Sequence, residues 1–217
     1  MIEVNKIYND DCLNVLKQLP DKSIDLVLTD PPYGIGEAKK NNASRGKLAI
    51  AKDYGKKDWD DRIPQKEIFD EIFRVSKNQI IFGGNYFVEY LNNSSCWLVW
   101  DKNNGANDFA DCELAWTNFK SAVRKYKWTW NGMLQEDMKH KDIRIHPTQK
   151  PLKLFEMILR DYSRENDLIL DCFSGSGTTA VACHNLNRRF ICIEKDYDYW
   201  KASVERLERE QAQMRLF

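Results

Sequence analysis

The chain has 217 residues, of which 42% are hydrophobic, so it can bury one sizeable core and we expect a single domain. Lysine and arginine together number 33, as do aspartate and glutamate, so the net charge gives no sign of a polyanionic partner. The six cysteines form no C-x-x-C pair and no metal-ligand spacing with the three histidines, and no apolar stretch approaches membrane-spanning length. We therefore expect reduced thiols, no metal site and a cytoplasmic protein.

Short apolar runs alternate with helical patterns along most of the chain, which is typical of a parallel sheet covered by helices. The predicted strands are 24–29, 79–82, 97–100, 167–170 and 189–193. The predicted helices are 12–18, 65–76, 86–91, 152–162, 178–186 and 197–210. The sequence therefore predicts an α/β fold with a Rossmann-like, doubly wound and mostly parallel sheet.

Two stretches depart from this alternation. Residues 34–62 are polar and basic without periodicity, and we expect a long mobile loop there. Residues 101–144 contain two strand-like pieces, 112–119 and 123–130, which we expect to form a hairpin inserted into the α/β frame. Both stretches concentrate basic residues, with seven against two acidic ones over 37–57 and eight against three over 120–150. They could face phosphates or be solvated loops, and charge alone does not decide between these.

The first chemical motif is Asp-Pro-Pro-Tyr, which directly follows the predicted strand 24–29. Ligands of open α/β sheets bind just beyond the carboxyl ends of strands. An exocyclic base amine is a poor nucleophile, and hydrogen-bond acceptors on its protons favour the positive charge that develops during methyl transfer. Asp30 and the Pro31 carbonyl could be those acceptors, with Pro31 and Pro32 holding them still and Tyr33 stacking on an extruded base. The alternative is a turn that only ends the strand.

The second motif, Asp-Cys-Phe-Ser-Gly-Ser-Gly-Thr-Thr at 171–179, follows a predicted strand and opens a helix. Its glycines permit a tight turn and a close approach to a ligand, and the helix start offers free N–H groups. It lacks the Gly-Lys-Ser/Thr of a phosphate-binding loop, and Ala180 stands where the dinucleotide pattern has its third glycine, although alanine is sometimes accepted there. The next strand ends at Glu194, whose carboxylate could bind both hydroxyls of a ribose, so the motif favours a nucleoside ligand.

Together these residues resemble the β class of S-adenosylmethionine-dependent DNA amino-methyltransferases, which act on the exocyclic amine of adenine or, less often, cytosine. The shared motifs are, in chain order, Asn-Asp-Asp-Cys-Leu at 9–13, Asp-Pro-Pro-Tyr at 30–33, His-Pro-Thr-Gln-Lys-Pro at 146–151 and the glycine-rich motif at 171–179. The tetrapeptide precedes the glycine loop, as in the circularly permuted class I fold of this class. The match is close over 5–36 and 144–200 and looser between them.

The resemblance implies an active enzyme that flips a base of double-stranded DNA and transfers the methyl group directly, leaving S-adenosylhomocysteine. Asp at position 30 favours adenine, because members that methylate cytosine more often carry serine there. An RNA methyltransferase is the less favoured alternative, since its motif order differs, and a vestigial DNA-binding module is less favoured still. The resemblance also implies a bacterial, phage or mobile-element origin, as part of a restriction-modification system or as an orphan enzyme.

The resemblance also implies where the cofactor binds. Its adenine and ribose would lie beside Asp11, Cys12, Glu194 and Lys195. Its methionine end would be surrounded by Asp30, Thr148, Lys150, Asp171, Phe173, Ser174, Gly175, Ser176, Gly177, Thr178 and Thr179. Asn9-Asp10 stand before Asp11 where glycine is common, so either aspartate could face the cofactor.

An enzyme that flips a base must hold the duplex with basic and aromatic side chains. We therefore expect 101–144 to be the target-recognition region and 34–62 to order over DNA. The residues expected to contact DNA are Lys39, Lys40, Arg45, Lys47, Arg124, Lys125, Lys127 and Trp128. For Trp128 and Trp130, packing on one face of a strand is the alternative.

The last five residues, Gln-Met-Arg-Leu-Phe, resemble the short Gln-x-x-Leu-Phe peptides that dock bacterial DNA enzymes onto the sliding clamp. We expect a tail over 211–217, and the alternative is a terminal helix that tucks Leu216 and Phe217 onto the core. The resemblance also allows a homodimer, for which the sequence carries no signature.

Overall fold

The fold is seen in a computed structural model that describes residues 2–36, 57, 59–104, 110–131 and 134–214. Its main sheet has eight strands: β1 (Lys6–Asn9), β2 (Ile24–Thr29), β3 (Ser76–Phe82), β4 (Trp97–Asp101), β5 (Cys112–Thr117), β6 (Arg124–Lys127), β9 (Leu168–Asp171) and β10 (Arg189–Glu194). A separate pair consists of β7 (Trp130–Asn131) and β8 (Leu134–Gln135). The helices are α1 (Cys12–Leu16), α2 (Lys66–Val75), α3 (Leu152–Tyr162), α4 (Thr178–Asn185) and α5 (Tyr197–Met214), with a 3-10 turn at Gly84–Tyr86.

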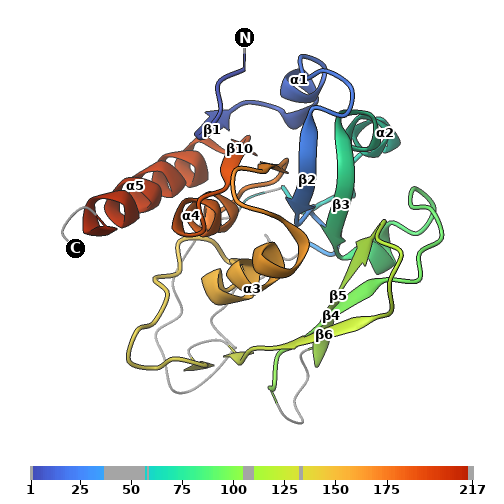
Figure 1. The fold of residues 1–217 in the computed structure, drawn as a ribbon. Helices are drawn as coiled ribbons and strands as arrows, with labels where there is room; N and C mark the ends of the chain where they lie inside the picture. Colours follow the sequence, from blue (N-terminus) through green and yellow to red (C-terminus); the bar gives the residue numbers. More distant parts are fainter. Residues whose placement is uncertain (1, 37–56, 58, 105–109, 132–133, 215–217) are drawn as a thin grey trace.

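The strand order in the main sheet is β1-β10-β9-β2-β3-β5-β4-β6 (Figure 1). The first five are parallel to one another, β5 runs antiparallel to both its neighbours, and β6 is parallel to β4. The sequence prediction of a mostly parallel, Rossmann-like α/β sheet is confirmed.

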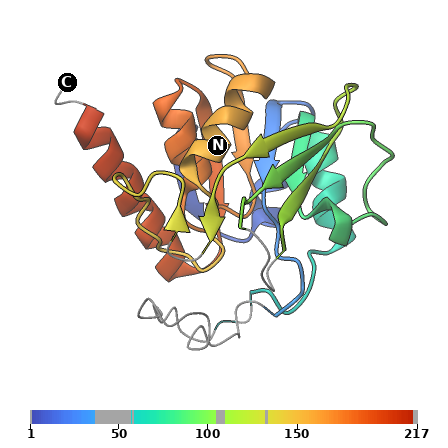
Figure 2. The ribbon, with the colours of Figure 1, turned by 90° about the horizontal axis from the view of Figure 1, so that it is seen from below.

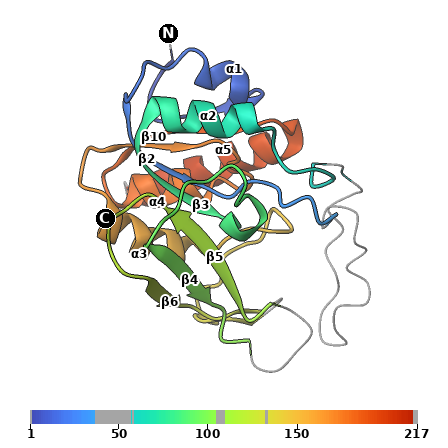
Figure 3. The same cartoon turned by 90° about the vertical axis from the view of Figure 1, so that its right-hand side faces the viewer.

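Alternate residues of the central strands bury against different helices, because successive side chains of a strand point to opposite faces. Leu26 and Leu28 of β2 lie in a core cluster with residues of α3, α4 and α5. Val27 lies in a second cluster with residues of α1 and α2. The sheet is therefore the middle of three layers (Figure 3), and α2 and α5 lie on opposite flanks of the molecule (Figure 2). Within the described residues, no helix is long and apolar enough to span a bilayer.

The hairpin predicted between 112–119 and 123–130 is wrong. Strands β5 and β6 do not pair with each other; both pair with β4, from opposite sides. The side chain of Asn118 accepts a hydrogen bond from Gln79 N and donates one to Lys77 O, which ties the chain after β5 to β3 instead of turning it back. As a result β5 is an interior strand of the main sheet, although it lies in the segment expected to be an insert.

The helix predicted over 86–91 is also wrong. The chain makes only the short turn Gly84–Tyr86 after Gly83, which is left-handed with φ +67°. Its hydrogen bonds link residues three apart, Phe87 N to Gly84 O and Tyr90 N to Phe87 O. The apolar spacing that suggested a helix instead buries Phe87 against Phe69.

Candidate functional site

The sequence motifs meet at one edge of the sheet. Asp30 follows β2, Asp171 ends β9, Glu194 ends β10 and Asn9 ends β1. These four strands are parallel neighbours, so their carboxyl ends lie side by side. The fold therefore brings together segments that are more than 140 residues apart, as the hydrogen bond of 2.8 Å from Thr29 Oγ1 to Asp171 Oδ1 shows.

The glycine-rich motif forms a turn between β9 and α4. Gly175 and Gly177 have φ of +50° and +73°, a region that side chains other than glycine adopt at a cost. A Cβ on Gly177 would also lie 2.9 Å from Cβ of Ser203 in α5. Both glycines are therefore required by backbone conformation, and Gly177 also by its close approach to α5.

The Asp171 carboxylate is buried and turned toward its own loop. It accepts hydrogen bonds from the hydroxyls of Thr29 and Thr179 and from Phe173 N at 3.1 Å. Burial raises the pKa of Asp171 to about 6. The structure thus makes Asp171 and Thr179 supports of the loop, while Phe173 is partly buried beside the α1 and α2 cluster.

The hydroxyls of Ser176 and Thr178 also point into the protein. Thr178 Oγ1 donates to Lys150 O at 3.2 Å and accepts from Arg206 Nη1 at 3.0 Å. Arg206, on α5, is buried and donates to Ser176 O at 3.1 Å. Arg206 was not predicted from the sequence, because its position on a long amphipathic helix carries no signal of this role. Ser174 differs, because its Oγ is buried with no hydrogen-bond partner of ordinary geometry in the described chain.

Glu194 lies where the end of β10 meets the glycine loop. Its carboxylate accepts hydrogen bonds from Gly175 N at 2.7 Å and from Asp196 N at 2.8 Å. Burial raises the pKa of Glu194 to about 7. This carboxylate is therefore held firmly by backbone donors at the edge of the glycine turn.

The motif after β1 places its two aspartates differently. Asp11 caps α1 by accepting from Leu13 N at 3.0 Å, and its other oxygen accepts from Lys195 Nζ at 2.9 Å. Asp10 accepts from Asp11 N and from the Asn14 side chain, both within α1's first turn. Asp11 is thus the aspartate tied to the end of β10. The neighbouring Cys12 is buried, which raises the pKa of its thiol to about 12.

Four charged side chains alternate in sign around the Asp-Pro-Pro-Tyr loop. Lys150 Nζ forms ion pairs with Asp30 Oδ2 and, at 3.1 Å, with Glu113 Oε2. The other oxygen of Glu113 pairs with Lys102 Nζ at 2.6 Å. All four side chains are mostly shielded from solvent, with exposed fractions between 7% and 20%. Asp30 and Lys150 were predicted from the sequence; Glu113, on β5, and Lys102, just after β4, were not.

The ring of Tyr33 is fixed on several sides. Its hydroxyl donates to Asp30 Oδ1 at 2.6 Å, and its ring stacks on Tyr86 with centroids 4.8 Å apart. The ring also lies against Gly83, where an added Cβ would come within 2.1 Å of it. One ring face is therefore already covered by Tyr86, which is itself 44% exposed. Tyr86 was not predicted as a site residue, because it lies in the segment predicted as a helix.

The His-Pro-Thr-Gln-Lys-Pro segment is held by a buried histidine. The His146 ring packs against Trp59 and Tyr199, and its Nδ1 lies 3.1 Å from Thr148 Oγ1. Burial lowers the pKa of His146 to about 3, so the ring is neutral. This packing fixes the segment that carries Lys150 to Asp30.

Of the residues expected to contact DNA, Lys39, Lys40, Arg45 and Lys47 lie outside the described residues. Arg124, Lys125 and Lys127 are exposed on the edge strand β6, where Lys125 Nζ lies 3.3 Å from Asp101 Oδ2. Trp128 is partly buried against the main core and Trp130 is buried, which supports the packing alternative for these two.

The tail expected over 211–217 is wrong for its first four residues, because α5 continues through Met214. Gln213 is exposed on the last turn of this helix. Residues 215–217, with the expected Leu-Phe anchor, lie outside the described residues.

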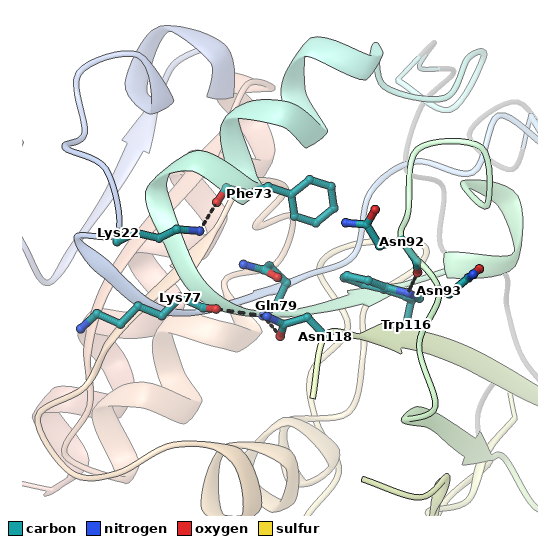
Figure 4. A pocket seen from close by; sticks show the side chains of 8 residues that line it. All are labelled: Lys22, Phe73, Lys77, Gln79, Asn92, Asn93, Trp116 and Asn118. Atoms are coloured by element: carbon teal, nitrogen blue, oxygen red, sulfur yellow. Dashed lines mark hydrogen bonds between the residues drawn. The ribbon is translucent and has the colours of Figure 1, made fainter. Parts of the chain in front are cut away.

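A cavity of about 320 Å³ lies at the other end of the sheet, near the start of β3 (Figure 4). Two of its lining side chains are already engaged: Lys22 Nζ donates to Phe73 O at 2.7 Å, and Trp116 Nε1 donates to Asn92 O at 2.8 Å. None of the predicted motifs reaches it. The candidate site is therefore the motif edge and not this cavity.

Comparison with known proteins agrees with the motifs. Residues 89–205 match the model of a family described as DNA methylase. The chain is 26% identical to the type II methyltransferase M1.MboII of Moraxella bovis over 92% of this chain and 95% of the relative. It is 28% identical to the type II methyltransferase M2.DpnII of Streptococcus pneumoniae, over 94% and 90% of the two chains.

Solved structures agree as well. The complex of M1.HpyAVI with S-adenosylmethionine superposes with a TM-score of 0.58 at 26% identity, over 93% of this chain and 98% of the other. The cytosine-N4-specific PvuII DNA methyltransferase superposes with a TM-score of 0.60 over 95% and 90% of the chains. Its identity is 19%, so this second likeness supports the fold alone.

Proposed function

The chain belongs to the DNA methylase family of S-adenosylmethionine-dependent amino-methyltransferases, and from that premise we propose that it methylates the exocyclic amine of adenine in duplex DNA. The observation that carries the proposal is the position of Asp30, at the end of β2 and one residue from the Thr29–Asp171 bond that joins the tetrapeptide to the glycine loop. Aspartate at this position favours adenine, because members acting on cytosine more often carry serine. Cytosine is the second candidate, because the class that these motifs resemble acts on the exocyclic amine of either base.

In this proposal the loop at 30–33 polarises the target amine. The Asp30 carboxylate and the Pro31 carbonyl accept hydrogen bonds from the two amine protons, which stabilises the positive charge that develops on the nitrogen. Pro31 and Pro32 restrict the backbone, and the Tyr33 hydroxyl orients the carboxylate through its 2.6 Å bond to Asp30. The cofactor supplies an electrophilic methyl group, so transfer is direct and requires no covalent enzyme intermediate.

The residues at the motif edge fit the cofactor. Gly175 and Gly177 form a turn without side chains, and Ser174 offers a buried hydroxyl that makes no hydrogen bond of ordinary geometry to a described residue. We assign Glu194 to the ribose hydroxyls and Asp11 with Cys12 to the adenine. Lys150 and Thr148 would lie over the methionine end. Asp171, Ser176, Thr178 and Thr179 act through the shape of the loop, because their polar groups face the protein.

Duplex DNA would lie across the rim that carries Tyr86 and the edge strand β6. A base inside a duplex cannot reach the Asp30 loop, so the enzyme must flip it. On β6, Arg124, Lys125 and Lys127 supply positive charge for the phosphates, and the basic segment 34–62 follows Tyr33 directly in the sequence. Both segments therefore belong to the proposed recognition of the target.

Two partners beyond DNA belong to the proposal. The first is the bacterial sliding clamp, bound through Gln213–Phe217; a pull-down that compares the full chain with one ending at Gln211 tests it. The second is another copy of the chain, which sedimentation at several concentrations tests. The bacterial relatives favour a cytoplasmic enzyme of bacterial or phage origin, in a restriction-modification system or as an orphan.

The deciding experiment is to express the protein in a methylation-free bacterial host and sequence the DNA with detection of modified bases. We expect N6-methyladenine at one recognition site, and none with Asp30→Ala as the matched control. N4-methylcytosine would replace the adenine proposal with the cytosine one. Methylation of RNA but not of DNA in a parallel assay with purified protein would overturn both.

A further inference from the structure

The chain of alternating charges beside Asp30 joins four elements that are distant in sequence. Asp30 follows β2, Lys150 precedes α3, Glu113 lies on β5 and Lys102 follows β4. Lys150 Nζ contacts both carboxylates, and Glu113 contacts both lysines. Since isolated buried charges are costly, four of them remain here because each has a neighbour of opposite sign.

Lys150 creates an electrostatic difficulty for methyl transfer. The target amine is neutral before the reaction and becomes positive during it, so it needs the negative charge of Asp30. An ammonium fixed on Asp30 alone would cancel that charge and repel the developing cation. Glu113 reduces this repulsion, because its Oε2 lies 3.1 Å from the same Lys150 Nζ and adds a second negative charge next to the loop.

We propose that Glu113 is a positioning residue for methyl transfer: it shares the Lys150 ammonium with Asp30, so that Lys150 does not cancel the negative potential that the ionised Asp30 carboxylate exerts on the target amine. Lys102 completes the arrangement by anchoring the second oxygen of Glu113 at 2.6 Å. The Tyr33 hydroxyl lies 3.5 Å from Glu113 Oε2, so the same carboxylate also borders the ring expected to meet the base. The inference rests on the role proposed for Asp30.

The acidic limb of the pH–rate profile is the sharpest readout, because activity requires Asp30 to be ionised. The groups that face Asp30 are Tyr33 from its own loop, Lys150, Glu113 and Asp171. Burial raises the pKa of Asp30, Lys150 opposes that shift, and the negative charge of Glu113 adds to it. Removing the charge of Glu113 therefore lowers the pKa of Asp30, and removing Lys102 raises it by leaving Glu113 uncompensated.

The test measures single-turnover methylation of duplex DNA against pH, at saturating S-adenosylmethionine and DNA. Glu113→Gln should slow transfer by roughly tenfold or more and move the acidic limb to lower pH. Lys102→Met should move the limb to higher pH. Calorimetry should show S-adenosylmethionine binding within about threefold of wild type in both variants, since neither side chain is assigned to the cofactor.

Glu156→Gln is the matched control, because Glu156 is also a nearly buried carboxylate paired with a lysine, Lys153 at 3.2 Å, but lies on α3 outside the site. It should leave the limb unmoved. If Glu113→Gln is too unstable to assay, Glu113→Asp keeps the charge and should retain the wild-type limb with a reduced rate. The proposal would be overturned if Glu113→Gln kept the wild-type rate or the wild-type acidic limb. It would also be overturned if Glu113→Gln and Lys102→Met moved the acidic limb in the same direction. Substantial turnover by Asp30→Ala would instead overturn the underlying role of Asp30.

Discussion

Replacing Gly83 with alanine should disturb the catalytic loop through one side chain, Tyr33. Gly83 has φ +67°, and a Cβ there would lie 2.1 Å from Cε1 and 2.6 Å from Cδ1 of Tyr33. Real Cβ contacts almost never fall below 3.0 Å, so one of the two groups must move. The Tyr33 ring is stacked on Tyr86 and its hydroxyl is bonded to Asp30, so it has little room to move without shifting the carboxylate.

The expected loss of stability has two parts. The left-handed backbone costs an alanine about 1–2 kcal/mol relative to glycine. Overpacking against the Tyr33 ring adds about 1–3 kcal/mol. Gly36→Ala separates the two parts, because Gly36 has nearly the same φ of +69° but no described residue lies within 4 Å of an added Cβ. Gly36→Ala should therefore show the backbone part only.

Urea denaturation of the two variants measures these losses, and single-turnover methylation measures the effect on the loop. We expect Gly83→Ala to lose about 2–5 kcal/mol of unfolding free energy and to methylate more slowly even below the unfolding transition. Gly36→Ala should lose about 1–2 kcal/mol. Equal losses in the two variants would show that Tyr33 does not press on Gly83, and the reasoning about the loop would be wrong.

Three further outcomes follow from the site. Asp30→Ala should abolish methylation while calorimetry shows S-adenosylmethionine affinity within about threefold of wild type, and substantial turnover would contradict the acceptor role. The cofactor affinity should fall as the pH is lowered through about 7, because the pKa of Glu194 in the free protein is raised to about 7 and only the ionised carboxylate accepts both ribose hydroxyls. Glu194→Gln should bind the cofactor more weakly and with little pH dependence. In the wild-type protein the free energy of unfolding should fall as the pH rises from about 4.5 to 7, because the native state holds the Glu194 proton more tightly than the unfolded state does. Glu194→Gln should lack this fall. Alanine at Lys125 and Lys127 should weaken DNA binding and reduce its salt slope by about 0.9 for each phosphate that the variant no longer neutralises, and an unchanged slope would exclude β6 from the interface.

The sequence predicted the parallel part of the fold well, because each buried strand there is a short apolar run with a helix after it. Strand β2 and helix α3 have the predicted bounds, and β9, β10 and α4 differ by a residue at their ends. The motif residues also meet as expected, since parallel neighbours present their carboxyl ends at one edge. Strand β1 was missed because it is an edge strand of four residues with exposed ends, which leaves almost no apolar pattern.

The antiparallel part could not be predicted in the same way. Which strand pairs with which depends on interactions between distant segments, such as those of Asn118 with Lys77 and Gln79. For the same reason Glu113, a lone carboxylate in an apolar strand, could not be predicted as a site residue. Its significance appears only when β5 is placed between β3 and β4, where it reaches Lys150.

The order of the motifs along the chain matters less than the bonds that join them. Thr29 Oγ1 donates to Asp171 and accepts from Cys172 N at 3.2 Å, so the residue before Asp30 is fixed directly to the start of the glycine loop. At the end of the glycine loop, Thr178 Oγ1 donates to Lys150 O and so joins that loop to the segment that carries Lys150. These bonds run between neighbouring strands and loops, not along the chain. A permuted chain that keeps β2 beside β9 therefore keeps the carboxylate, the lysine and the glycine turn in one place, whichever motif is synthesised first.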